Sequence, residues 1–371
     1  MTNQGLGLYL HIPFCESKCN YCSFYSMAAN DETKELYKKA LLKETKKWGE
    51  KVFRPITSIY VGGGTPSALK ADAIAEIINC VKSNFSVCED AEITVEVNPK
   101  SASLDFFKTL LNCGVNRLSI GVQSGNDSEL VSLGRLHNKK TAEETFLSAR
   151  KAGFKNISLD LMLGLPDSNL DSLKQTLDFF RSLSPEHISA YILKIEDNTH
   201  FSKIKDTLNL PDEDQIAEQY LFLSKTLAAW GYEHYEISNF AKENKVSRHN
   251  VNYWRCGEYL GIGPAAHSFF EGKRFYYPND LKGFLEGSET VFDCVGGERD
   301  EFIMLNLRLK AGLDLKELEN EYNVVPSTAF LNKVKLFEKN GLCTFKDNVI
   351  SLTDNGMLLS NQIIAQLECC L

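Results

Sequence analysis

The chain has 371 residues, of which 43% are hydrophobic and 24% charged, so it is long enough for one large globular domain and a smaller one. Its 41 lysines and arginines against 49 aspartates and glutamates give a net charge of −8, which excludes an overall basic field for nucleic acid. No apolar run approaches the roughly twenty residues of a membrane span, and the N-terminal Met-Thr-Asn-Gln-Gly lacks the regions of a secretory signal. The eleven cysteines therefore do not predict a disulfide framework, the protein is expected to be cytoplasmic, and a peripheral place at the inner face of the membrane stays open.

The first two-thirds of the chain alternates short, β-rich apolar runs with amphipathic helical stretches. Strands are expected over 6–12, 58–61, 92–97, 117–122, 156–163 and 187–193, and helices over 31–48, 70–83, 104–112, 141–152 and 170–183. Strands and helices that alternate at this spacing form βαβ units around a parallel sheet. Six such units predict an α/β fold with a partial (β/α)6 barrel, similar to a TIM barrel, rather than an open sheet.

The pattern changes after residue 195. A helix is expected over 212–230, followed by an irregular, aromatic and glycine-rich stretch over 232–277. Helices over 299–309, 314–322 and 327–340, a hairpin over 341–352 and a last helix to 367 predict a winged-helix-like, α-rich domain. Few basic residues cluster there, so we expect a structural or partner-docking lobe rather than a DNA reader. The predicted domains are 1–230 (barrel), 231–297 (irregular connecting segment) and 298–371 (C-terminal domain).

Three cysteines follow the first predicted strand in a C-x3-C-x2-C array, Cys15, Cys19 and Cys22. Three thiolates can hold a cubane [4Fe–4S] cluster and leave one iron open for a substrate or cofactor. The spacing also fits a buried helix face with three small apolar side chains, or a structural zinc site with a distant fourth ligand. Pro13 and the polar residues 16–18 argue against a continuous helix, so the cluster is favoured over zinc, and zinc over packing.

Polar residues stand at or near the ends of the predicted strands. The cysteine loop follows the first strand, the glycine run 62–66 (Gly-Gly-Gly-Thr-Pro) follows the second, Glu96 and Gln123 end the third and fourth, and Asp160 lies in the fifth. Parallel α/β proteins form their active sites where the C-terminal strand ends meet. Each residue alone is a common cap or turn residue, but together they predict a single site. Glycines there would let the backbone approach an amino-acid-like ligand closely.

These motifs resemble a known family. The runs Y-L-H-I-P-F-C-E-S-K-C-N-Y-C (9–22), G-G-G-T-P (62–66), E-V-N-P (96–99), G-V-Q-S (121–124) and D-L-M-L-G-L-P (160–166) are similar to the radical S-adenosylmethionine (SAM) superfamily. More narrowly, the chain resembles the oxygen-independent coproporphyrinogen III oxidase group from about Leu6 to the C-terminus. The resemblance implies that the amine and carboxylate of SAM chelate the open iron, and that an electron from the cluster cleaves SAM to methionine and a 5′-deoxyadenosyl radical.

The resemblance also implies roles for single residues, matched position by position. Cys15, Cys19 and Cys22 match the cluster ligands. Tyr9 and Tyr21 match residues that pack near the cluster and SAM, Gly63, Gly64 and Thr65 match the loop that touches SAM, and Glu96, Gln123, Arg135 and Asp160 match further SAM contacts. The chemistry agrees, because carboxylates accept hydrogen bonds from ribose hydroxyls or an ammonium and an arginine pairs with a carboxylate.

One departure separates two branches of this group. The oxidases carry a fourth cysteine directly after the array, as C-x-C, whereas Cys22 is followed here by Ser23 and Phe24. This pattern resembles the heme chaperone branch, long described as oxidase-like. A second match to that branch is the run R-H-N-V-N-Y-W (248–254), which contains the H-N-x-x-Y-W motif that the branch uses in heme binding.

The heme motif implies that His249 ligates heme iron, with Arg248 near a propionate and Tyr253 and Trp254 near the porphyrin face. Taken alone, a histidine beside aromatic residues is more often a hydrogen-bonded packing residue. Cys256 is a rival axial ligand.

We therefore expect a heme chaperone with a [4Fe–4S] cluster and SAM in its barrel. It would pass heme to acceptor proteins, such as those of a membrane respiratory chain, and would need a reductant for the cluster but no nucleic acid. The cluster and SAM would regulate or trigger transfer, so whether the protein is an enzyme stays open. The alternative is an oxygen-independent coproporphyrinogen III oxidase, which decarboxylates two propionates. A scaffold with an unused cluster site is disfavoured by the intact array and glycine loop.

Overall fold

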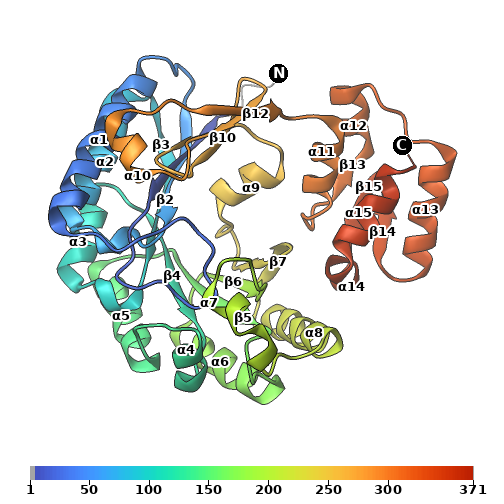
Figure 1. Ribbon diagram of the computed structural model, residues 1–371. Coiled ribbons are helices and arrows are strands. Elements are labelled where there is room, and N and C mark those ends of the chain that lie inside the picture. Colours follow the sequence, from blue (N-terminus) through green and yellow to red (C-terminus); the bar gives the residue numbers. More distant parts are fainter. Residues whose placement is uncertain (1–4, 371) are drawn as a thin grey trace.

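The computed structural model describes residues 5–370 and consists of a large α/β body and a smaller C-terminal lobe (Figure 1). Six strands of the body alternate with helices along the chain: β1 (Leu6–Ile12), β2 (Ile56–Gly63), β3 (Val87–Val97), β4 (Arg117–Gln123), β5 (Ile157–Leu163) and β6 (His187–Ile192). They pair in this order, and every pair is parallel. The six predicted strands are confirmed, although β3 starts five residues earlier than expected.

The barrel is partial because its sheet does not close. On one side β9 (Tyr259–Ile262) pairs in parallel with β1, followed by the antiparallel β10 (His267–Phe270), β11 (Lys273–Tyr276) and β12 (Val291–Val295). On the other side β8 (Asn239–Ala241) and β7 (Glu233–Glu236) follow β6 in antiparallel pairing. Strands β12 and β7 are the two edges of this 12-stranded sheet. The predicted partial (β/α)6 barrel is confirmed.

Helices cover the outer side of the parallel strands. They are α1 (Asp31–Gly49), α2 (Ala71–Asn84), α3 (Leu104–Asn112), α5 (Lys139–Ala152), α6 (Leu170–Leu183) and α8 (Glu213–Ala229), with the short α4 (Asp127–Ser132) and α7 (His200–Lys203) between strands and helices. Side chains at the first residue before a helix satisfy its free amides, as Asn30 does for α1, Ser103 for α3 and Asn138 for α5. Within residues 5–370, no helix combines the length and apolarity that a bilayer crossing requires.

Residues 231–297 are more regular than the sequence predicted. Instead of an irregular segment they form strands β7–β12 and the helices α9 (Arg248–Trp254) and α10 (Leu281–Glu286). The prediction failed because each of these elements is at most seven residues long, which is too short for a clear periodicity. Their pairing partners also lie far away in the chain, as for β9 with β1. The domain boundaries at 230 and 297 stay a prediction, because the sheet continues across residue 231.

The C-terminal lobe surrounds a small sheet with short helices. Its elements are α11 (Arg299–Asn306), β13 (Leu313–Asp314), α12 (Leu315–Tyr322), α13 (Thr328–Lys339), β14 (Cys343–Lys346), β15 (Val349–Leu352), α14 (Asp354–Leu358) and α15 (Ser360–Glu368). The antiparallel pair β14–β15 is the predicted hairpin. The predicted last helix is two helices, since α14 ends at Leu358 and α15 starts at Ser360. The winged-helix-like interpretation of the lobe holds.

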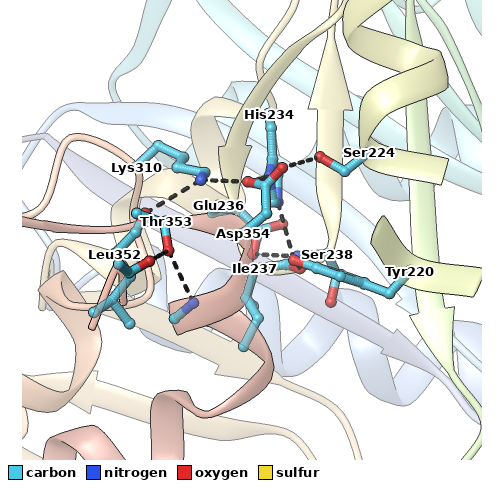
Figure 2. Close-up of polar contacts among 12 residues, drawn as sticks. Tyr220, Ser224, His234, Glu236, Ile237, Ser238, Lys310, Leu352, Thr353 and Asp354 are labelled. Carbon is cyan, nitrogen blue, oxygen red and sulfur yellow. Dashed lines mark hydrogen bonds and ion pairs between the residues drawn. The ribbon is translucent and has the colours of Figure 1, made fainter. Parts of the chain in front are cut away.

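Asp354, at the start of α14, fastens the lobe to the body (Figure 2). Its carboxylate accepts a hydrogen bond from Ser224 Oγ of α8 at 2.6 Å and lies 3.2 Å from His234 Nδ1 of β7. Lys310 Nζ completes the set. These partners, His234 first, hold the pKa of Asp354 well below its usual range. Because the buried apolar residues of body and lobe also form one continuous core, the lobe is packed on the body and not merely tethered to it.

Candidate functional site

A cavity of about 440 Å³ lies at the C-terminal ends of the parallel strands. Its wall contains these predicted residues: Cys15, Cys19, Tyr21, Cys22, Gly63, Gly64, Thr65, Glu96, Gln123, Arg135 and Asp160. Of the residues predicted to contact the cluster or SAM, Tyr9 alone is not in the wall; its hydroxyl is hydrogen-bonded with His11 Nδ1 at 2.9 Å. The structure thus brings nearly all of them to one cavity, while their individual roles stay predictions.

The three cysteines lie on the loop between β1 and α1, and none is in a disulfide. Cys15 Sγ is 3.4 Å from Thr65 Oγ1, and Arg135 Nη1 donates to Cys19 Sγ at 3.4 Å. No three His, Cys, Asp or Glu side chains in the described chain are placed to hold a single metal ion. Three free thiols around one cavity, with a guanidinium beside them to balance thiolate charge, are a donor set that fits a [4Fe–4S] cluster.

The loop after β2 packs so closely on the cysteine loop that it needs its glycines. Gly63 has a φ of 112°, and a Cβ there would lie 2.6 Å from the ring of His11. A Cβ on Gly64 would lie 2.7 Å from the backbone oxygen of Phe14. Side chains at these positions would therefore push the glycine loop away from the cysteine loop. The backbone N–H of Gly64 donates to the backbone oxygen of Ile12 at 2.8 Å, which fixes the glycine loop against the cysteine loop at the cavity wall.

Glu96 connects the glycine loop to the barrel interior. Its Oε1 accepts a hydrogen bond from the Tyr60 hydroxyl at 2.8 Å, and its Oε2 accepts one from the backbone N–H of Gly63 at 3.2 Å. Burial raises the pKa of Glu96 to about 7, although the hydrogen bond from Tyr60 stabilises the charged carboxylate and lowers the pKa. This carboxyl therefore changes charge near neutral pH, at the wall of the cavity.

Arg135 and Asp160 complete the charged groups of the cavity wall. Arg135 donates to the backbone oxygen of Gly121, and its buried Nε has no hydrogen-bond partner among the described residues. A guanidinium in the wall of a cavity is suited to a carboxylate ligand. Asp160 accepts from Ser119 Oγ at 3.0 Å, and burial raises its pKa. Gln123, at the end of β4, has a φ of 74°, an uncommon conformation for a residue other than glycine.

The predicted heme motif lies at the opposite end of the barrel, hereafter the barrel floor. Helix α9 lies between the body and the lobe (Figure 1). His249 points into the barrel: its Nδ1 is 2.8 Å from Ser58 Oγ, its Nε2 is 2.6 Å from the Tyr253 hydroxyl, and its ring stacks on Tyr60. Gly63 lies five positions after Ser58 along β2, which is about 16 Å of strand. His249 is 1% exposed, and burial, helped by Arg117, lowers its pKa to about 3, so its imidazole is neutral.

The other motif residues point away from His249. Arg248 forms an ion pair with Asp90 at 2.9 Å, and the ring of Trp254 lies 5.6 Å from the guanidinium of Arg308, just after α11. The structure thus brings His249 and Tyr253 together inside the barrel but directs Arg248 toward Asp90 and Trp254 toward Arg308. A heme contacted by all four residues requires α9 to change its position.

Sequence reasoning missed two residues that organise these sites. Tyr60 stacks on His249 and donates to Glu96, so it contacts both ends of the barrel. The signal that could have identified it is the spacing of Ser58 and Tyr60, which places two polar side chains on the same face of β2. Glu92 accepts hydrogen bonds from the backbone N–H groups of Arg248 and His249, each at 3.0 Å. No local signal identifies it, because its partners are more than 150 residues away.

Comparisons with known proteins decide the family. The model of the radical SAM superfamily matches residues 9–180, and that of the HemN C-terminal domain matches 299–359. The heme chaperone HemW of Bacillus subtilis is 34% identical in an alignment that covers 96% of this chain and 97% of the relative. The chain belongs to the HemW family. HemW of Buchnera aphidicola (subsp. Schizaphis graminum) is 40% identical and covers 97% of both chains.

One solved structure that resembles this chain is the coproporphyrinogen III oxidase HemN of Escherichia coli, described as a radical SAM enzyme. Its structure superposes with a TM-score of 0.84 at 25% identity and covers 99% of this chain and 91% of its own. Since the coverage includes residues 299–370, the HemW-family chain shares both the barrel and the C-terminal lobe with that enzyme. The fold alone therefore does not separate the chaperone from the oxidase.

Proposed function

We propose that the chain is a heme chaperone, which binds heme and transfers it to acceptor proteins. The observation that carries the proposal is its family: relatives named heme chaperone match almost the whole chain at 34% and 40% identity. The motif 249–254 and the Ser23-Phe24 pair after Cys22 favour the chaperone over the oxidase. We infer that the protein is cytoplasmic and that its heme acceptors include respiratory-chain proteins at the membrane. Its cluster would receive an electron from a one-electron reductant.

The test compares heme binding with oxidase activity in the same preparation. Anaerobically reconstituted protein is titrated with heme while the Soret band is followed, and is separately incubated with coproporphyrinogen III, SAM and a reductant. We expect a saturable Soret change, transfer of the bound heme to an apo heme protein, and no sustained formation of protoporphyrinogen. Steady turnover to protoporphyrinogen would contradict the chaperone function.

The residues at the cavity fit the cofactors of the radical SAM superfamily. A [4Fe–4S] cluster with SAM, when bound, supplies a low-potential electron next to a reactive sulfonium. We propose that Cys15, Cys19 and Cys22 donate the thiolates. The glycine loop would receive the methionyl group, Arg135 would pair with its carboxylate, and Glu96 and Asp160 would accept from the ammonium or the ribose hydroxyls.

We propose that heme binds at His249 after α9 leaves the barrel floor. Both imidazole nitrogens are engaged, with Ser58 and Tyr253, so neither is free for iron while α9 stays in place. The neutral imidazole is the form that ligates a metal, and burial keeps His249 in that form as long as α9 is in place. Outside the barrel, Trp254 and Tyr253 could then lie against a porphyrin face, and Arg248 could exchange Asp90 for a propionate.

The affinity for SAM is expected to rise with pH through about 7. Glu96 has a pKa near 7, so its carboxyl is neutral below that pH and becomes the stronger, charged acceptor above it. Calorimetric titration of reconstituted protein with SAM from about pH 6 to about pH 8, a range that includes the pKa of Glu96, measures the effect. Glu96→Gln, which keeps the size of the side chain but cannot ionise, should bind SAM more weakly and without this slope. A slope that persists in Glu96→Gln would assign the titration to another group.

A further inference from the structure

Arg117, the first residue of β4, is a buried cation without an ion-pair partner. It is 2% exposed, and its Nε has no hydrogen-bond partner among residues 5–370. The arginines that form ion pairs in this part of the chain are Arg54, Arg150, Arg248, Arg274 and Arg299. An arginine keeps its charge in proteins, and a buried charge costs free energy unless a partner compensates it. Within contact distance, the described chain thus supplies no anion for this guanidinium.

Strand alternation places Arg117 inside the barrel. Side chains two positions apart along a strand share a face, and Ser119, two positions later on β4, lines the cavity. The register aligns Arg117 with Thr94 of β3, and Thr94 with Tyr60 of β2. Thr94 also faces inward, because Glu96, two positions later on β3, lines the cavity. Tyr60, Thr94 and Arg117 therefore form a row across three strands, one level below the cavity wall.

Thr94 is the second member of this row without a partner. Its side chain is fully buried, and its Oγ1 forms no hydrogen bond within the described chain. Most buried polar side-chain atoms in proteins are hydrogen-bonded, so two unpartnered groups on adjacent strands indicate a place for a polar ligand. A guanidinium and a hydroxyl both donate hydrogen bonds, and a carboxylate accepts from both. The pair is therefore suited to a carboxylate ligand.

The carboxylates at inward positions of β3 and β5 accept hydrogen bonds from groups other than Arg117. They are Glu92, Glu96 and Asp160. Burial raises the pKa values of Glu96 and Asp160, and Arg117 lowers both by a smaller amount, so it acts on them from a distance. None of the three could move onto the guanidinium without leaving an N–H or a hydroxyl unpaired, which carries its own cost.

His249 covers the row on the side of the barrel floor. Its ring stacks on Tyr60 with the ring centroids 5.2 Å apart, and its Nδ1 lies 2.8 Å from the hydroxyl of Ser58, two positions nearer the floor on β2. Next to burial, Arg117 is the group that lowers the pKa of His249, so the two side chains lie near each other. If α9 leaves the floor, as proposed for heme binding, the imidazole departs and the row opens.

We propose that Arg117 and Thr94 form a carboxylate subsite, which receives a propionate of the heme cargo when α9 leaves the barrel floor. The subsite rests on the proposed chaperone function and names the groups that recognise one end of the cargo. Arg117 would supply the charge and Thr94 a second donor, and both hydrogen bonds are stronger in a buried setting than in water. His249 on the displaced α9 would hold the iron, and Arg248 would remain for the second propionate.

The experiment compares heme with its dimethyl ester, in which both propionates are methylated and uncharged. Soret titration measures the affinity for each compound in the wild type, Arg117→Met and Thr94→Val. Arg117→Met should lower heme affinity at least about tenfold, because a charge-assisted hydrogen bond is lost. It should change the affinity for the ester less than about twofold, because the ester offers no charged acceptor. Thr94→Val keeps the side-chain shape and should lower heme affinity about two- to tenfold, again without effect on the ester.

Arg150→Met is the matched control. Arg150 is a partly buried arginine of α5 that pairs with Glu186 at 2.6 Å, so its loss should change heme affinity less than about twofold. Thermal unfolding of the heme-free proteins checks the fold, and Arg117→Met should unfold at a temperature no lower than the wild type, since an unpaired buried charge costs free energy.

The outcomes separate the subsite from the chaperone function. Equal losses for heme and ester, or no loss of heme affinity in Arg117→Met, would overturn the subsite and leave the chaperone function in place. If Arg117→Met did not fold, Thr94→Val would decide by the same criterion. A wild type that does not bind heme would overturn the chaperone function and the subsite with it.

Discussion

Replacing Cys22 with serine is expected to abolish assembly of the [4Fe–4S] cluster while leaving the fold intact. The three cysteines supply all the thiolates of the proposed site, and a serine hydroxyl is a much poorer ligand for iron than a thiolate. Iron and sulfide content after anaerobic reconstitution, with the visible absorbance of the cluster, measures the loss. SAM affinity should fall with it, because the open iron is the proposed anchor of the methionyl group.

The matched control is Cys294→Ser. Cys294 is an exposed cysteine on β12, outside the cavity wall, so this variant should bind as much iron as the wild type. Far-ultraviolet circular dichroism of both variants checks the fold. If Cys22→Ser kept the full iron content of the wild type, Cys22 would not be a cluster ligand.

The second large effect concerns heme, and two changes at the barrel floor should move its affinity in opposite directions. His249→Ala removes the proposed iron ligand and should weaken heme binding by at least about tenfold, the factor that about 1.4 kcal/mol represents. Tyr253→Phe removes the hydroxyl that competes with iron for Nε2. A hydrogen bond contributes about 0.5–1.5 kcal/mol net, so this variant should bind heme about two- to tenfold more tightly. Soret titration measures both.

His267→Ala serves as the control for the histidine variant. His267 is exposed on β10 and stacks on Tyr276, so its loss should leave heme affinity unchanged. An unchanged affinity of His249→Ala would make the ligand assignment wrong and direct attention to Cys256. Weaker heme binding by Tyr253→Phe would instead show that the phenol supports the bound heme.

The cavity was predictable from the sequence because most of its residues stand at the C-terminal ends of parallel strands or in the loops directly after them. Glu96 and Gln123 stand at or next to strand ends, and the cysteine and glycine loops follow strands directly, so a correct reading of the strands places them together. The periodicity of the first two-thirds was clear enough for that reading. Tyr9 lies in a predicted strand as expected, yet it faces His11 rather than the cavity. Which neighbour an inward side chain meets depends on barrel stagger, which a single sequence does not contain.

The barrel floor was not predictable in the same way. The motif 249–254 suggested an accessible heme ligand, but the structure buries His249 against Ser58 and caps α9 with Glu92. These contacts join segments 157 to 191 residues apart, and no periodicity or turn signal marks them. The short strands on either side of α9 were missed for the same reason, since they are ordered by distant partners.

The positions of the cavity and α9 have a consequence for the order of loading. The cavity proposed for SAM opens at the C-terminal strand ends, whereas α9, with the proposed heme ligand His249, closes the barrel floor. SAM and heme would therefore approach the barrel from opposite directions. Neither would block the route of the other, and SAM and heme should bind in random order without competing. Each of the two sites could then be filled or emptied while the other holds its ligand.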